Sequence, residues 1–137
     1  TDAEGRQWSL SDFAGAGFVL YFYPRDDTPG CTVEACEFRD SSAEFAARGV
    51  RVVGVSPDSA ASHDKFRRKY GLSFILLSDP EKKTLAAYGA YGEKMMYGKK
   101  TMGVIRSTFI IDGKGIIKKV FPRVTPAGHA AQVLAAL

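Results

Sequence analysis

The sequence predicts an α/β domain built on a mixed central sheet with helices on both faces. Between residues 18 and 89, apolar strand-like runs alternate with helix-like segments, which is typical of a parallel sheet. A hairpin pattern at 107–121 adds antiparallel strands. The chain has 137 residues, 45% of them apolar, and shows neither a repeat nor a linker. We therefore expect residues 1–137 to share one core.

The first half of the chain contains two buried strands. Residues 1–10 contain a turn-like Asp-x-x-Gly followed by a short strand-like segment. A turn of this kind usually connects two strands, and no strand precedes it here. We therefore expect a strand or hairpin to be missing before residue 1. FVLYFY at 18–23 is a continuous apolar and aromatic run, as in a strand buried on both faces, and Pro24 ends it. A helix that closes near Gly49 follows, and VRVVGVS at 50–56 is the second strand.

The second half continues the alternation and then changes to a hairpin. We expect a helix over 59–70, a strand at 74–79, a helix that begins with the proline of 80–89, a tight turn at 112–115, and a final helix from about Pro126.

Composition and charge exclude several function classes. The net charge of +4 comes without any basic run longer than Arg67-Arg68-Lys69, so nucleic-acid binding has no support. No apolar run approaches the roughly 18 to 20 residues of a transmembrane helix, so we expect no membrane association. Two cysteines do not make a disulfide framework, and we expect a reducing, cytoplasmic location.

The two cysteines, Cys31 and Cys36, lie five positions apart near the expected start of a helix. Thr28-Pro29 is typical of a helix entry, which places Cys31 in the first turn. Free backbone N–H groups and the helix dipole favour a thiolate there. Cys31 also shares a helical stripe with two phenylalanines, so we expect it to be recessed. A small buried structural cysteine is the alternative.

The spacing of the cysteines restricts what they can do together. On an intact helix their Cα atoms are about 8.7 Å apart, whereas disulfides need about 4.4 to 6.8 Å. A bond between them therefore requires the first turns to unwind. Zinc usually takes four ligands, and the remaining candidates, His63 and His129, are predicted on the surface, so no metal is expected. A thioredoxin-type site for dithiol exchange is also disfavoured, because its two cysteines normally have the spacing C-x-x-C. What remains is a thiol that is oxidised by substrate and captured by the second thiol.

A low thiol pKa alone cannot explain fast peroxide reduction. Complete ionisation raises the thiolate population at pH 7 by at most roughly thirtyfold, or about 2 kcal/mol. The site must also stabilise the departing oxygen, and the candidates are the Thr28 hydroxyl, the amides near Gly30 and Cys31, and Arg106. Arg106 interrupts the apolar strand GVIRSTFIID and is always charged. An arginine at an exposed strand end is the alternative.

These residues resemble a known motif. PRDDTPGC matches the Pro-x-x-x-Thr-x-x-Cys active-site pattern of peroxiredoxins at Pro24, Thr28 and Cys31. Two further segments also match the peroxiredoxin family. IRSTFIID matches the strand that carries the family's arginine, here Arg106, and YGEKMMYGK at 91–99 resembles a recurrent stretch.

With Cys36 five positions after Cys31, the chain from Gly5 onward is similar to the peroxiredoxin Q subgroup, also called bacterioferritin comigratory protein. The resemblance implies a thioredoxin-like fold, with Cys31 as the peroxidatic thiol and Cys36 as the resolving thiol. Glu34 matches a position that is often acidic and helps to orient the arginine, with a solvated helix glutamate as the alternative. Pro24 is expected to shield the sulfur, or simply to end its strand.

The predicted function is thus a thiol peroxidase for hydrogen peroxide, organic hydroperoxides or both. The resemblance implies regeneration by thioredoxin or a similar dithiol, no cofactor, and a monomer sufficient for the chemistry. The rival prediction is a non-catalytic redox sensor or binding module, in which slow oxidation of Cys31 and Cys36 changes a partner surface.

Overall fold

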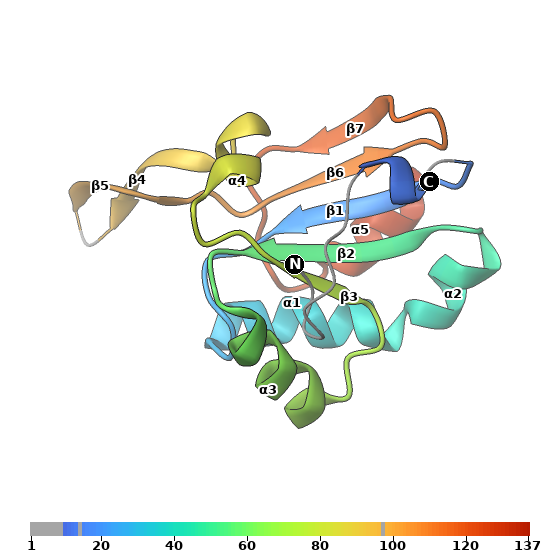
Figure 1. Cartoon of the computed structure of the whole chain (residues 1–137), viewed down its shortest axis with the longest axis horizontal. Helices are drawn as coiled ribbons and strands as arrows, with labels where there is room; N and C mark the ends of the chain where they lie inside the picture. The colour runs from blue at the N-terminus through green and yellow to red at the C-terminus, as the bar shows by residue number, and fades with distance from the viewer. Residues whose placement is uncertain (1–9, 14, 97) are drawn as a thin grey trace.

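A computed structural model describes residues 10–13, 15–96 and 98–137, and its centre is a five-stranded mixed sheet (Figure 1). The strand order is β3-β2-β1-β6-β7; β1 to β3 are mutually parallel, and β6 and β7 are antiparallel to their neighbours. The strands are β1 (Phe18–Phe22), β2 (Arg51–Ser56), β3 (Ile75–Ser78), β6 (Ser107–Ile111) and β7 (Ile117–Phe121). The predicted mixed sheet is confirmed.

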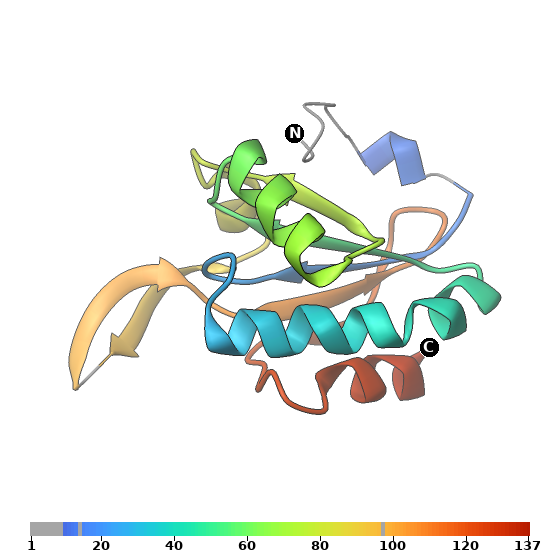
Figure 2. The same cartoon turned by 90° about the horizontal axis from the view of Figure 1, so that it is seen from below.

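Helices cover both faces of this sheet (Figures 1 and 2). One face carries α1 (Pro29–Asp40), α2 (Ser42–Ala47), α3 (Ala60–Tyr70) and α5 (His129–Ala136), and the other carries the 3-10 helix η1 (Leu10–Phe13) and α4 (Lys83–Ala87). Figure 2 shows α1 and α5 side by side beneath the sheet. Each face has its own apolar cluster, and Cys31, Phe38 and Phe45 belong to the cluster under α1 and α2. Helices on both faces are therefore confirmed.

Local sequence explains why these elements begin, end and pack where they do. All five residues of β1 are buried, as its continuous apolar run predicts. Ser59 caps α3 by accepting a hydrogen bond from Ser62 N, and Gly71 ends that helix in the left-handed conformation. Gly54 in β2 leaves room for the Tyr21 ring, because a Cβ there would lie 2.8 Å from Tyr21 Cζ.

The structure differs from the prediction in three places. The helix expected to reach Gly49 is two helices that meet at Ser41, and the helix of 80–89 is only the short α4. A separate two-stranded hairpin, β4 (Tyr91–Met96) and β5 (Lys99–Val104), was not predicted; it projects from the body of the molecule in Figure 1. The prediction for residues 1–10 falls almost entirely outside the described residues.

The register of β1 and β6 brings two distant segments together. Phe22, the last residue of β1, pairs with Ser107, the first residue of β6. The loop that follows β1 therefore lies beside the residue that precedes β6, which is Arg106. No helix among the described residues is long and apolar enough to span a membrane.

Candidate active site at the start of α1

The first turn of α1 places Cys31 in the core. Thr28 is the N-cap residue, with extended φ and ψ of −99° and 155°, and Pro29 is the first helical residue. Cys31 lies in that turn and is only 1% exposed, as its apolar stripe predicts. The Thr28 side chain does not cap the helix; its hydroxyl donates to Arg25 O at 2.9 Å instead. The helix therefore begins at Thr28-Pro29, as the sequence predicted, without a hydrogen bond from the Thr28 side chain to the first turn.

Arg106 connects the sulfur of Cys31 with a buried carboxylate. Its Nη2 donates to Cys31 Sγ at 3.2 Å, and its Nη1 donates to Glu34 Oε1 at 2.8 Å. The Arg106 side chain is 15% exposed, and its carbonyl accepts from Val124 N at 3.0 Å. The alternative of an arginine at an exposed strand end is therefore wrong. The guanidinium fork fixes the cation at the sulfur.

Glu34 is fully buried and faces Arg106, so the alternative of a solvated helix glutamate is also wrong. Its second oxygen, Oε2, has no hydrogen-bond partner among the described residues. Burial raises the pKa of Glu34 to about 7, although the ion pair with Arg106 acts in the opposite direction. Burial prevails because one hydrogen-bonded oxygen does not replace the lost hydration of a carboxylate. Glu34 therefore exchanges a proton near neutral pH.

Gly30 fits between Arg106 and the segment before α5. A Cβ at Gly30 would lie 3.3 Å from Arg106 Nη2 and 3.3 Å from Pro126 Cγ. Contacts this short require the guanidinium or the Pro126 ring to shift by a few tenths of an ångström. The sequence suggested that the amides near Gly30 act at the site and that Gly30 allows the helix end to unwind. The space that Gly30 leaves for the arginine depends on contacts across the fold, so local sequence could not predict it.

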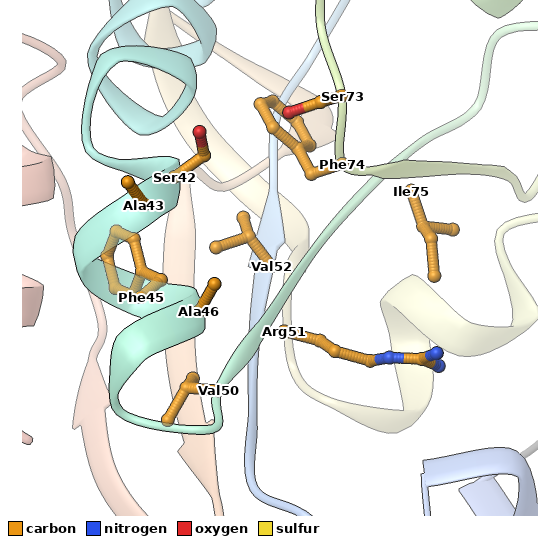
Figure 3. A pocket seen from close by; sticks show the side chains of 10 residues that line it. All are labelled: Ser42, Ala43, Phe45, Ala46, Val50, Arg51, Val52, Ser73, Phe74 and Ile75. Carbon is orange, nitrogen blue, oxygen red and sulfur yellow. The ribbon is translucent and has the colours of Figure 1, made fainter.

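A cavity of about 290 Å³ lies next to this site. It is lined by Pro24, Val104, Ile105, Arg106, Arg123 and Val124. Pro24 and Arg106 thus line the same space, which suits a small or partly apolar molecule. A larger cavity of about 470 Å³, lined among others by Phe45, Arg51 and Phe74, lies between α2 and β3 (Figure 3). It contains none of the predicted site residues.

Cys36 lies on the same helix as Cys31, and both thiols are free. Cys31 is buried, whereas Cys36 is partly exposed. Because α1 is continuous from Pro29 to Asp40, the Cα separation of about 8.7 Å expected from helix geometry applies here. The arrangement leaves Cys31 reduced beside Arg106, and a disulfide requires part of α1 to unwind.

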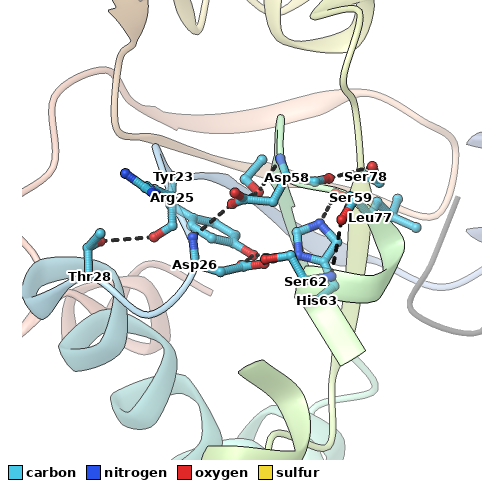
Figure 4. A network of polar contacts seen from close by, with 11 residues as sticks. Tyr23, Arg25, Asp26, Thr28, Asp58, Ser59, Ser62, His63, Leu77 and Ser78 are labelled. Carbon is cyan, nitrogen blue, oxygen red and sulfur yellow. Dashed lines mark hydrogen bonds and ion pairs between the residues drawn. The ribbon is translucent and has the colours of Figure 1, made fainter. Parts of the chain in front are cut away.

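Both histidines are buried, so their predicted surface positions are wrong. His129 Nε2 lies 2.7 Å from Thr108 Oγ1, and desolvation lowers its pKa. His63 belongs to a polar network with Asp26 and Asp58, and three potential metal-ligand atoms of this trio lie within 4.8 Å of one another. The carboxylates and the imidazole already have hydrogen-bond partners within the protein (Figure 4). The network therefore explains the burial of His63 without a metal ion.

Comparison with known proteins gives consistent similarities. The sequence profile of the AhpC/TSA family matches residues 1–120. Peroxiredoxin Bcp of Bacillus subtilis is 47% identical over 133 residues, which cover 97% of this chain and 85% of that protein. Peroxiredoxin Bcp of Escherichia coli is 41% identical over 133 residues, with coverage of 97% and 85%.

Solved structures agree with these sequence matches. A cysteine-to-serine mutant of Xanthomonas campestris peroxiredoxin Q is similar with a TM-score of 0.95 and 43% identity, over 99% of this chain and 87% of that one. A second match is the bacterioferritin comigratory protein of the same organism, studied for its alkyl peroxide reduction activity. Its TM-score is 0.94 and its identity 42%, with coverage of 99% and 87%.

Proposed function

The chain belongs to the AhpC/TSA family, as a peroxiredoxin similar to the Bcp and peroxiredoxin Q proteins, and from this membership we propose how its residues carry out thiol-dependent reduction of hydroperoxides. Cys31 is the peroxidatic thiol, and Cys36 is the resolving thiol. The observation that carries the proposal is the Arg106 fork, which holds Cys31 Sγ and Glu34 Oε1 at once. A buried cation aimed at a sulfur suits a thiolate that must attack an electrophile.

In the first step, the Cys31 thiolate attacks one peroxide oxygen. An S–O bond forms as the O–O bond breaks, and the departing alkoxide or hydroxide takes up a proton to become an alcohol or water. Cys31 becomes a sulfenic acid. Arg106 and the amides of the first turn stabilise the negative charge that moves onto the departing oxygen. The Thr28 hydroxyl donates to Arg25 O, so its free lone pairs can accept a hydrogen bond from the peroxide.

Pro24 contributes shape rather than charge. It lines the cavity beside Arg106, together with apolar side chains such as Val104 and Ile105. We assign Pro24 to excluding water from the sulfur, and Glu34 to orienting Arg106. Alkyl peroxide reduction by the Xanthomonas campestris relative supports a cavity that accepts organic hydroperoxides as well as hydrogen peroxide.

In the second step, the Cys36 thiol attacks the Cys31 sulfenic acid, forms a disulfide and releases water. This step requires local unwinding of α1, for which Gly30 and Thr32 are suitable because both are poor helix formers at a helix end. A dithiol reductant, for which thioredoxin is our proposal, then reduces the disulfide by thiol–disulfide exchange. Both thiols lie in one chain, so we propose that a monomer is sufficient and that a reducing compartment such as the cytoplasm suits the cycle.

Consumption of peroxide tests the proposal against the rival redox sensor. Purified protein is mixed with thioredoxin, its reductase and NADPH, and the loss of hydrogen peroxide or tert-butyl hydroperoxide is followed for wild type and Cys31→Ser. We expect turnover by the wild type and background rates for the variant. Equal rates for both proteins would eliminate Cys31 as the peroxidatic residue, and a wild-type rate no faster than the uncatalysed reaction would favour the sensor.

A further inference from the structure

The loop between β1 and α1 is attached to α3 through a buried aspartate, Asp26 (Figure 4). Its side chain is only 4% exposed. Tyr23 OH donates to Oδ1 at 2.6 Å, and Ser62 Oγ donates to Oδ2 at 2.8 Å. His63 Nδ1 lies 2.7 Å from Oδ2. A carboxylate so fully partnered in the middle of a loop fixes that loop in one position.

The hydrogen-bond partners of His63 show where its protons lie. Nε2 is 2.9 Å from Leu77 O, and because a carbonyl only accepts, Nε2 carries a hydrogen. The 2.7 Å contact between Nδ1 and Asp26 Oδ2 needs a second proton between the two atoms. The pair is therefore either an imidazolium with a carboxylate or an imidazole with a carboxylic acid. In both cases His63 holds Asp26 through a buried, fully satisfied contact.

The hydrogen bonds continue from Asp26 to the first turn of α1. The peptide unit that joins Arg25 to Asp26 is held from both sides: Asp26 N donates to Asp58 Oδ2 at 2.8 Å, and Arg25 O accepts from Thr28 Oγ1 at 2.9 Å. Thr28 O in turn accepts from Thr32 N at 2.8 Å. An unbroken set of contacts thus runs from α3 to the turn that contains the peroxidatic thiol.

The neighbouring residue, Asp27, gives the same loop a second attachment to α3. Asp27 has a φ of 55°, a left-handed conformation that a non-glycine residue adopts only at a cost. Its carboxylate accepts from Lys69 Nζ at 2.8 Å and from Tyr70 OH at 2.7 Å. Both ends of α3 therefore hold the loop, and the buried end does so through Asp26.

We propose that Asp26, held by His63, is a positioning residue that keeps the loop and the first turn of α1 in the arrangement that reacts with peroxide. Its release favours the unwound arrangement in which Cys36 reaches Cys31. The inference rests on the proposed function, because it assigns opposite effects to the two steps of that cycle. Releasing the loop misplaces Thr28 and the first-turn amides, which slows the first step, and lowers the cost of unwinding, which speeds the second.

The experiment compares Asp26→Ala with Asp64→Ala, a matched substitution in α3 whose carboxylate binds only Arg67 and Arg68 among the described residues. Asp26→Asn is the rescue variant: its two amide hydrogens can donate to His63 Nδ1 and to Ser62 Oγ, while its oxygen still accepts from Tyr23. Rapid quenching with intact-mass analysis separates the two steps. It gives the second-order rate of sulfenic acid formation and the first-order rate of disulfide formation.

We expect Asp26→Ala to lower the first rate by about tenfold or more, because small misplacements cost this much, and to raise the second rate several-fold. Asp26→Asn and Asp64→Ala should keep both rates close to the wild type. Unchanged rates in Asp26→Ala, or rates that fall together, would overturn the inference. If Asp26→Ala does not fold, Ser62→Ala removes a single hydrogen bond to Asp26 and must shift the two rates in the same opposite directions. A wild type in which Cys31 never oxidises would instead overturn the proposed function.

Discussion

Replacing Glu34 with glutamine should remove a pH dependence from the stability of the reduced protein. Glu34 is fully buried, and only one of its oxygens is hydrogen-bonded among the described residues. Burial raises its pKa from 4.5 to about 7. The folded protein therefore binds the carboxyl proton more tightly than the unfolded chain does. Glu34 stabilises the fold most below pH 4.5, and this contribution is lost as the pH rises to about 7.

The size of the effect follows from the two pKa values. Each pH unit in this window changes the free energy of unfolding by about 1.4 kcal/mol, so the window from 4.5 to about 7 corresponds to about 3 kcal/mol. Glutamine is uncharged at every pH and has nearly the same shape. Glu34→Gln should therefore remove this contribution to the pH dependence, apart from a pH-independent offset for replacing the neutral carboxyl group with an amide.

Urea unfolding in the presence of reductant, at intervals from pH 4.5 to pH 8, measures this difference. Glu81→Gln is the control: Lys83 lowers the pKa of that exposed carboxyl, so removing it cannot produce the same flattening. Parallel curves of unfolding free energy against pH for the wild type and Glu34→Gln would show that burial does not raise the pKa of Glu34.

Three further substitutions test the contacts of the site and the core. Gly30→Ala places a Cβ against Arg106 Nη2 and should slow the reaction of Cys31 with peroxide several-fold, whereas Gly92→Ala, whose Cβ makes an ordinary 3.6 Å contact, should not. Arg106→Lys loses the fork and should slow that reaction by about a hundredfold. Thr108→Val leaves buried His129 Nε2 without its partner and should lower the free energy of unfolding by about 1 to 3 kcal/mol.

Stopped-flow mixing with peroxide checks the first two substitutions, and urea unfolding checks the third. If Gly30→Ala reacted as fast as Gly92→Ala, the proposed crowding of the guanidinium would be wrong. An Arg106→Lys variant with the wild-type rate would show that a point charge is enough. A Thr108→Val protein as stable as the wild type would mean that His129 finds another partner.

The fold was largely predictable because its strands are marked by local sequence. FVLYFY and VRVVGVS are long apolar runs, and they became β1 and β2. The break between α1 and α2 was missed because the apolar stripe through Phe38 and Phe45 continues across Ser41. The hairpin of β4 and β5 was missed because Gly92, Lys94 and Gly98 interrupt any alternation of apolar and polar residues.

The site was predictable only where local geometry determines it. Cys31 is recessed because its position in the α1 stripe requires this. The contact between Glu34 and Arg106 joins residues 72 positions apart, and only the resemblance to peroxiredoxins suggested it. The burial of His63 depends on Asp26, 37 positions away, so nothing near His63 in the sequence indicated it.

Intact-mass analysis after one equivalent of peroxide tests the central claim most directly. The reduced wild type should lose two hydrogens as Cys31 and Cys36 form a disulfide. Cys36→Ser should instead gain one oxygen at Cys31 and stall, or gain more with further peroxide. A Cys36→Ser protein that turned over normally with thioredoxin, or a wild type that accumulated the oxygen adduct without a disulfide, would contradict the account.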